Sequence, residues 1–501
     1  MQTAMTMNVT KKILGTLLLN LLTSVCSAQE LKADVETPAT KMDILFIAID
    51  DMNDWTTLFD KSNPIQTPNL ERLAARGAFF EKAYCASASC NPSRTATLTG
   101  LRPSTSGVYN NPDPWGEMLP DVITLPQVFK HNGYSAIGAG KIFTHGKAGA
   151  ERNDNPSFDA FYKLQPAGKS KHHADKSHMN YNGYPDGKRF FDWGEHDTDK
   201  QADEHTVEYV NEVMASHPRE KPLFLAAGIY RPHMPFFAPP RTFEKYPFHT
   251  LRMPPMPEND LADVPVLGVE MAGISLSGRN YTSQKPDDHP GSLKKMVQSY
   301  QAASDFADEM VGRLLDQLDK TGCAENTIIV LWSDHGYHLG DKTSCGKTTL
   351  WEKANHVPFI IVAPGITQPG TRIDTPVSLV DIYPTLLDLA VLPAMPGLDG
   401  QSLVPLLKAP QTKWARPALM TQGRGNHAVR SSDWRYIRYK DGTEELYDCK
   451  TDDPWNHSNL LAGEDRVKYA SVVAEHQKWL PKDEAPERGP EQVRDNKRNK
   501  R

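Results

Sequence analysis

The chain has 501 residues, of which 39% are hydrophobic and 24% are charged. This composition is typical of a globular protein and argues against a disordered chain, and the length suits one large domain plus a smaller one. Lys and Arg number 56 against 62 Asp and Glu, so the net charge is −6 and no basic surface for nucleic acid is expected.

The N-terminus has the pattern of a secretory signal peptide. Lys11 and Lys12 precede an apolar run over residues 13–22, and Cys26-Ser27-Ala28 supplies small residues for cleavage. We therefore expect residues 1–28 to be removed and the protein to be exported, to the periplasm or the medium. An uncleaved membrane anchor is the alternative, although this apolar run is short for a span and no later segment is long enough.

Six cysteines are present, and removal of Cys26 leaves an odd number for an oxidising compartment. Cys90 is set apart by its neighbours, which are described below. The remaining four, which either pair or stay reduced, are Cys85, Cys323, Cys345 and Cys449.

Alternating strand and helix patterns predict an α/β domain. Residues 44–49 form a continuous apolar run, typical of a parallel strand buried on both faces, and the run ends in Asp50-Asp51. A short helix is expected from Pro68, with Thr67 as its N-cap, to a stop at Gly77. The same reasoning predicts one long helix over residues 297–318 and three more strands, over residues 223–227, 327–332 and 359–362.

Two acidic clusters directly follow two of these predicted strands. Asp50-Asp51 follows residues 44–49, and Ser333-Asp334-His335-Gly336 follows residues 327–332. Open parallel sheets place their sites at the carboxyl ends of strands, so both clusters are expected at one edge. One such cluster alone is more often a solvated loop, but two at strand ends favour a metal site.

The rest of the chain divides into insertions, a subdomain and a tail. Residues 150–205 predict a long surface insertion, and the proline-rich residues 235–292 are expected to cover the cleft. Alternation over residues 434–439, a turn at 440–442 and a further strand at 445–447 predict a hairpin. The expected organisation is a signal peptide, a main domain, an antiparallel subdomain and a disordered tail, over residues 1–28, 29–414, 415–481 and 482–501.

The segment Cys90-Asn91-Pro92-Ser93-Arg94, followed by Leu98-Thr99-Gly100, resembles the signature of type I sulfatases. The pentapeptide alone also fits a buried cysteine beside a Pro-Ser turn, but further motifs follow in the family's order over most of residues 42–460. The resemblance implies an alkaline-phosphatase-like fold, with a mixed, mostly parallel sheet flanked by helices and a small C-terminal antiparallel subdomain.

The resemblance also implies that Cys90 is oxidised to formylglycine by a formylglycine-generating enzyme. The hydrated aldehyde carries two hydroxyl groups in this family. One attacks sulfur and carries the sulfate, and deprotonation of the other restores the aldehyde and expels sulfate. An ordinary serine lacks that second group. Arg94 would stabilise the formylglycine and its negative charge.

A divalent cation is implied at the acidic clusters, held by Asp50, Asp51, Asp334 and His335, with the modified Cys90 supplying a further oxygen. The cation would polarise the sulfate and keep the nucleophilic hydroxyl deprotonated. The commoner family pattern has asparagine at position 335, whereas the histidine form occurs in iduronate-2-sulfatase-like members. Calcium prefers oxygen ligands, so an imidazole leaves the metal's identity open, with calcium favoured.

Three further motifs imply residues around the sulfate. Lys141 and His145, within Gly140–Gly146, resemble the pair that holds the hydrated aldehyde, with His145 as the base for sulfate release, although their spacing is longer than in the common G-K-W-H form. His233, in the segment Tyr230–Pro235, would contact the sulfate and protonate the leaving oxygen. Lys347 would contact the sulfate and the ester oxygen.

The resemblance therefore implies a sulfuric ester hydrolase that acts in polysaccharide degradation. A sulfated sugar is the expected substrate, either a glycosaminoglycan or an algal polysaccharide such as ulvan or carrageenan, with specificity set by the variable insertions. A phosphate or phosphonate ester hydrolase of the same superfamily is one alternative, although such enzymes commonly use Ser or Thr and two metals. A non-catalytic carbohydrate-binding relative with unmodified Cys90 is the other, and the retained lysines and histidines argue against it.

Overall fold

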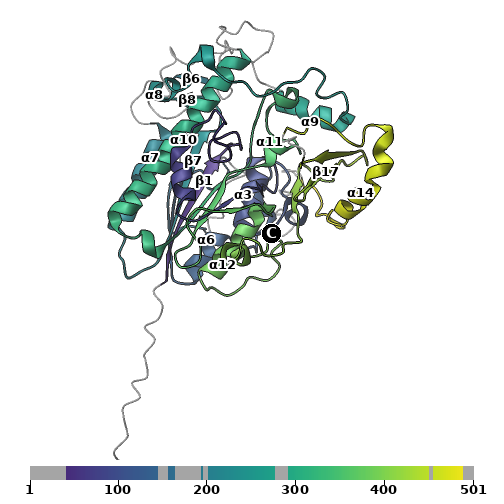
Figure 1. The fold of residues 1–501 in the computed structure, drawn as a ribbon. Helices are drawn as coiled ribbons and strands as arrows, with labels where there is room; N and C mark the ends of the chain where they lie inside the picture. The colour runs from purple at the N-terminus through teal and green to yellow at the C-terminus, as the bar shows by residue number, and fades with distance from the viewer. Residues whose placement is uncertain are drawn as a thin grey trace, which may run out of the picture. The chain divides into compact units, whose positions relative to one another are not determined.

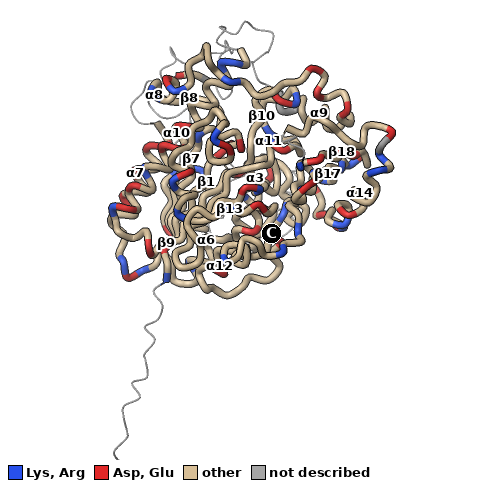
Figure 2. Tube along the Cα trace, viewed as in Figure 1, with Lys and Arg blue, Asp and Glu red and all other residues tan. Residues whose placement is uncertain are grey.

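The computed structural model describes residues 41–144, 156–163, 193–195, 201–276, 292–450 and 455–488 (Figure 1). The segment predicted as a signal peptide and most of the first predicted insertion lie outside these residues. Within the described part of the chain, the cysteines form no disulfide. No helix there has both the length and the apolar character needed to cross a membrane. Acidic and basic residues are interspersed along the described elements (Figure 2).

An eight-stranded sheet forms the framework, in the order β13-β2-β12-β9-β1-β7-β4-β5. Only β12 runs antiparallel to its two neighbours in this sheet, and the other adjacent pairs are parallel. The predicted mixed, mostly parallel sheet is confirmed. The strands are β1 (Asp43–Asp50), β2 (Ala78–Phe80), β4 (Ser135–Gly140), β5 (Ala160–Lys163), β7 (Leu223–Pro232), β9 (Thr327–Ser333), β12 (Phe359–Val362) and β13 (Thr371–Ile373).

β1 is buried on both faces, as its continuous apolar run predicts. Ile44, Phe46 and Ala48 belong to one hydrophobic core, and the alternate residues of the strand belong to the opposite core. The first core includes residues of α3 (Cys90–Thr99), α6 (Leu125–His131) and α12 (Ile382–Leu389). The second includes residues of α2 (Pro68–Ala74), α7 (Ala202–Ser216) and α10 (Leu293–Thr321), and α7 and α10 lie side by side in Figure 1.

The longest predicted helix is α10, with 29 residues. The hydroxyl of Ser292 caps its start by accepting the Lys295 amide at 3.3 Å. Gly322 ends it with a φ of 69°, a conformation that glycine adopts without a Cβ clash. The helix therefore extends a few residues beyond the range 297–318 that its apolar spacing predicts.

The predicted C-terminal hairpin is part of a four-stranded antiparallel sheet in the order β15-β16-β17-β18. Its strands are β15 (Ala418–Thr421), β16 (His427–Arg430), β17 (Trp434–Arg438) and β18 (Glu444–Asp448). Glu352, in α11 (Glu352–Asn355), links this sheet to β3 (Ala83–Tyr84), because it accepts hydrogen bonds from Arg435 at 2.8 Å and from Tyr84 at 2.7 Å. All three side chains are buried, and a buried ion pair of this kind loses much stability when one partner is removed.

Two predicted boundaries are wrong. The surface insertion assigned to residues 150–205 includes β5, which pairs with β4 in the large sheet. It also ends before Ala202, because residues 202–205 are the first turn of α7 and Asp203 is buried. The tail assigned from 482 is ordered at least to residue 488. The Ala485 amide donates to the Ser104 carbonyl at 2.7 Å, and the Tyr109 hydroxyl donates to the Ala485 carbonyl at 2.8 Å. Polar composition alone did not reveal these partners.

Gly228 in β7 allows a close approach to the chain that follows β4. A Cβ at this position would lie 2.3 Å from the carbonyl carbon of Lys141. We expect Gly228→Ala to lower the free energy of unfolding by about 1–3 kcal/mol through overpacking, measured as a lower urea midpoint. Gly273→Ala is the matched control, since among the described residues no atom beyond its chain neighbours and its own helix backbone lies within 4 Å of an added Cβ. Equal midpoints for the two variants would contradict the prediction.

Candidate active site

Four adjacent parallel strands, in the order β9-β1-β7-β4, end at one edge of the sheet. Ile49 of β1 pairs with Ser333 of β9, so the acidic clusters that follow these strands lie next to each other. The neighbouring strands β7 and β4 are followed by His233 and Lys141. The sheet therefore brings together side chains that are far apart in the sequence.

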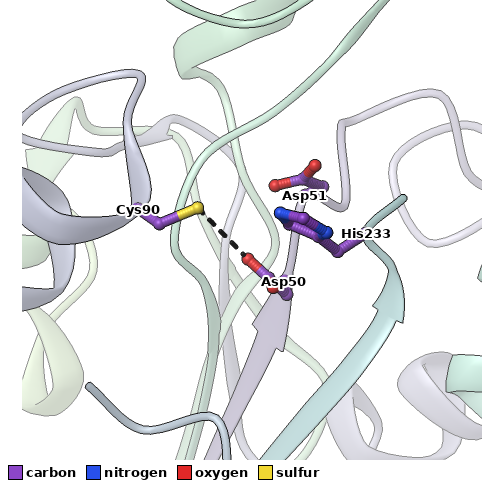
Figure 3. Close-up of side chains that lie close together, drawn as sticks. All are labelled: Asp50, Asp51, Cys90 and His233. Atoms are coloured by element: carbon purple, nitrogen blue, oxygen red, sulfur yellow. Dashed lines mark hydrogen bonds between the residues drawn. The ribbon is translucent and has the colours of Figure 1, made fainter. Parts of the chain in front are cut away.

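Cys90 reaches this edge from the first turn of α3. Its side chain is buried, with 3% of its surface exposed, and it points toward Asp50, with Asp51 and His233 beyond (Figure 3). The start of a helix carries partial positive charge from its unpaired amides, which favours an anion at this position. The nearest polar atoms around Cys90 Sγ are Lys347 Nζ at 3.1 Å, His335 Nε2 at 3.3 Å, Lys141 Nζ at 3.4 Å and Asp50 Oδ1 at 3.7 Å.

Buried carboxylates alternate with cations around the Cys90 side chain. Arg94 Nε donates to Asp334 Oδ2 at 2.7 Å, and the same guanidinium lies 3.3 Å from Asp50 Oδ1. Lys141 pairs with Asp50. Lys347 Nζ donates to Asp51 Oδ1 at 2.6 Å. Three carboxylates thus face three cations, so a divalent cation added here would leave a positive site for an anionic substrate.

The environments of the two neighbouring aspartates push their pKa values in opposite directions. Burial raises the pKa of Asp51 to about 7, although Lys347 and His335 oppose this shift. Burial also disfavours ionised Asp50, but Lys141, Arg94 and Lys347 outweigh it and hold the pKa of Asp50 below its usual range. A divalent cation bound to Asp51 would hold this carboxylate ionised.

The donor set fits a divalent cation. Ligand atoms of Asp50, Cys90, Asp334 and His335 lie within 4.8 Å of one another, and those of Asp50, Asp51, Cys90 and His233 form a second such group. His335 Nδ1 lies 3.0 Å from the Gly336 carbonyl oxygen. A carbonyl only accepts, so Nδ1 carries the proton, and Nε2, which lies beside the carboxylates, would offer its lone pair to a cation bound among them.

His233 is also held in one tautomer. Its Nδ1 donates to the Met234 carbonyl at 2.6 Å, so Nε2 is the ring nitrogen that can gain or lose a proton. Burial and the charges of Lys141 and Lys347 lower the pKa of His233. The imidazole is therefore neutral in the free protein, and an anionic group beside it would favour the protonated form. His145, the other predicted histidine, lies outside the described residues.

The structure adds supporting residues that the sequence did not single out. Tyr300 of α10 donates to the Asp51 carbonyl at 2.7 Å and accepts the Asn53 amide at 3.0 Å. Ser93 donates to the Asp334 carbonyl at 2.5 Å. Tyr300 is indistinguishable in the sequence from the other apolar residues at its helical spacing, whereas Ser93 lies inside the Cys90 motif.

Comparisons with known proteins agree over most of the chain. The profile of the family described as "Sulfatase" matches residues 42–392, and that described as "N-sulphoglucosamine sulphohydrolase, C-terminal" matches residues 340–484. A sulfatase of Formosa agariphila is 36% identical over 489 residues, 94% of this chain and 92% of that protein. Human (Homo sapiens) iduronate 2-sulfatase is 29% identical over 418 residues, 75% of this chain and 74% of that protein.

A solved structure has the same fold. The phosphonate monoester hydrolase of Agrobacterium radiobacter superposes with a TM-score of 0.69 at 20% identity, covering 88% of this chain and 96% of that chain. The large mostly parallel sheet with flanking helices is thus the predicted alkaline-phosphatase-like architecture. Since the sulfatase profile spans residues 42–392 and a sulfatase 36% identical aligns along nearly all of both chains, this protein belongs to the sulfatase family of sulfuric ester hydrolases.

Proposed function

We propose that the enzyme hydrolyses sulfate esters of a sulfated sugar or polysaccharide fragment, with formylglycine derived from Cys90 as its nucleophile. The surroundings of Cys90 Sγ carry this proposal, because two ammonium groups lie within 3.4 Å of it, beside three buried carboxylates. The name of the relative iduronate 2-sulfatase supports a sugar, either a glycosaminoglycan or an algal polysaccharide such as ulvan or carrageenan.

The residues around Cys90 suit sulfuryl transfer. Hydrated formylglycine supplies one hydroxyl that attacks sulfur and a second whose deprotonation releases sulfate. Lys141 and Lys347 place positive charge where a nucleophilic oxygen and the sulfate oxygens accumulate negative charge. Arg94 fixes Asp50 and Asp334 beside them. We assign His145 as the base for sulfate release.

His233 is the proposed proton donor to the leaving oxygen. A sugar alkoxide is a poor leaving group, so the sulfur–oxygen bond breaks faster when the bridging oxygen receives a proton. His233 Nε2 would give up this proton and return to the neutral form that its surroundings favour. Burial and the charges of Lys141 and Lys347, which lower the pKa of His233, would still act on it beside the sulfate and so favour release of this proton.

We propose calcium as the resident cation, held by Asp50, Asp51, Asp334 and His335 together with the modified Cys90. When bound, it would polarise the sulfate and lower the pKa of the nucleophilic hydroxyl. Three carboxylates supply the oxygen ligands that calcium prefers, with one imidazole.

We also infer export to the periplasm or the medium from the signal-peptide pattern of residues 1–28. Expressed in a bacterial host with its own N-terminus, the protein is expected outside the cytoplasm with a mature chain that begins near Gln29. N-terminal sequencing checks this. A chain that keeps Met1 and stays in the cytoplasm would refute it.

Replacement of Cys90 tests the nucleophile. Cys90→Ser keeps a hydroxyl but has no second one for sulfate release, so we expect turnover of an aryl sulfate to fall by more than about 1,000-fold. Mass spectrometry of the peptide around Cys90, from hosts with and without the modifying enzyme, should show the aldehyde only in the active protein. Full activity with an unmodified thiol would sink the formylglycine proposal. An aryl phosphate assayed in parallel should be the poorer substrate.

Metal removal tests the cation site. Chelation should abolish aryl sulfate turnover, and calcium should restore it and raise the melting temperature. Asp334→Asn should weaken calcium binding by more than about 100-fold, because even partners behind a ligand contribute roughly 10- to 100-fold. Metal content measured by mass spectrometry is the readout, and Asp381→Asn, a buried carboxylate in a separate hydrogen-bonded turn, is the control. Unchanged metal content in Asp334→Asn would contradict the site.

A further inference from the structure

We propose that Asp203 and Arg231 are positioning residues for His233, and that they set how well this histidine protonates the leaving oxygen. This inference rests on the proposed function, because it concerns the role assigned there to His233. Both residues are buried, with 2% and 4% of their surfaces exposed. The sequence motifs assign neither of them a role on sulfate, although Arg231 lies in the same segment as His233.

Asp203 ties the end of β7 to the start of α7. One of its carboxylate oxygens accepts the Tyr230 amide at 2.7 Å, and the other accepts the Arg231 amide at 2.9 Å. Both amides lie within three residues of His233. Hydrogen bonds that backbone amides donate to an ionised carboxylate are roughly twice as strong as those between neutral groups, so this contact fixes the backbone that leads into His233.

Arg231 closes the turn on the other side of His233. Its Nε donates to the Phe237 carbonyl at 2.7 Å, and its Nη1 donates to the His233 carbonyl at 3.2 Å. The turn from β7 into β8 (Phe236–Ala238) is thus bracketed by one guanidinium. Asp203 supplies the opposite charge for this buried cation, and a buried charge persists only when it is paired and hydrogen-bonded.

The same turn sets the direction of the imidazole. The Met234 carbonyl accepts both His233 Nδ1 at 2.6 Å and the Tyr230 hydroxyl at 2.8 Å. The rings of His233 and Tyr230 lie 4.8 Å apart, and the Arg231 guanidinium lies 5.3 Å from the centre of the Tyr230 ring. Asp203 and Arg231 therefore hold the residues that aim Nε2, while His233 itself makes the proton transfer.

Leaving-group dependence separates positioning from general stability. In the reaction, His233 Nε2–H gives its proton to the bridging oxygen as the sulfur–oxygen bond breaks. Aryl sulfates with acidic phenols need little of this help, whereas those with weakly acidic phenols need it most. For Arg231→Gln and Asp203→Asn we expect kcat/KM to fall at least about 10-fold more on the poorest leaving group than on the best.

Three comparisons make the test decisive. Asp308→Asn is the matched control, because Asp308 is also buried and accepts two backbone amides, those of Asn69 and Leu70 at the start of α2. Asp308→Asn should leave the leaving-group slope unchanged, that is, the change of log kcat/KM with the pKa of the phenol that leaves. In the double variant with Arg231→Gln and His233→Ala, the dependence of kcat/KM on the leaving group should be no steeper than in His233→Ala alone. Arg231 acts only by positioning His233, so its loss has no further effect once the imidazole is gone. Arg231→Lys, checked by its melting curve, serves if Arg231→Gln does not fold.

The outcomes distinguish the positioning role of Asp203 and Arg231 from the proposed hydrolysis of sulfate esters. Equal losses on all aryl sulfates, or a steeper slope in the double variant than in His233→Ala, overturn the positioning role while sulfatase activity stands. A slope that His233→Ala does not steepen removes the proton-donor role and this inference with it. Failure of the wild-type enzyme on every sulfate ester would refute the proposed function itself.

Discussion

The parallel pairing of β1 with β9 is the constraint on which the site depends. It places Asp50-Asp51 and Asp334-His335 at one edge of the sheet. Both strands are held in this register because their alternate side chains are buried in the cores on the two faces of the sheet. A shift of the register would move Asp334 away from the Asp51 amide that it accepts at 3.1 Å. The position of α3 then determines where Cys90 meets these carboxylates, and Arg94 of the same helix fixes this position by binding Asp50 and Asp334.

Gathering so many buried charges is costly unless each is compensated. An isolated carboxylate or ammonium in a protein interior pays several kcal/mol of desolvation, which pairing repays only with good geometry. Around Cys90 each carboxylate contacts a cation from another element, and Asp334 also accepts backbone amides. The charges therefore stabilise one another in the free protein, and their side chains are held in place before any cation or substrate arrives.

The sequence predicts the main strands, helices and motifs, but it does not predict the hydrogen bonds and ion pairs that form between elements far apart in the chain. The apolar runs of β1 and β9 and the cysteine motif are local signals, so strands, acidic clusters and Cys90 were recognisable. Asp203 was assigned to a surface insertion, because its polar neighbours mask a helix start, and only the packing of α7 against β7 reveals its role. Glu352 and Arg435 pair across 83 residues, a relation that no local pattern encodes.

Lys347 and His233 need different degrees of restraint in their proposed roles. Lys347 acts as a point charge, and moving its Nζ from 3.1 Å to about 1 Å farther from the Cys90 position would cost about a quarter of their Coulomb energy. A proton donor depends on hydrogen-bond geometry, for which an error of about 1 Å costs on the order of 100-fold in rate. The two side chains are restrained to different degrees in the structure. Lys347 lies in a loop, and 12% of its side chain is exposed. His233 is instead enclosed by a tyrosine ring, a carbonyl acceptor and a turn closed by Arg231. The hydrogen bonds that hold the turn after β7 thus suit the proposed proton transfer better than a role as a charge alone.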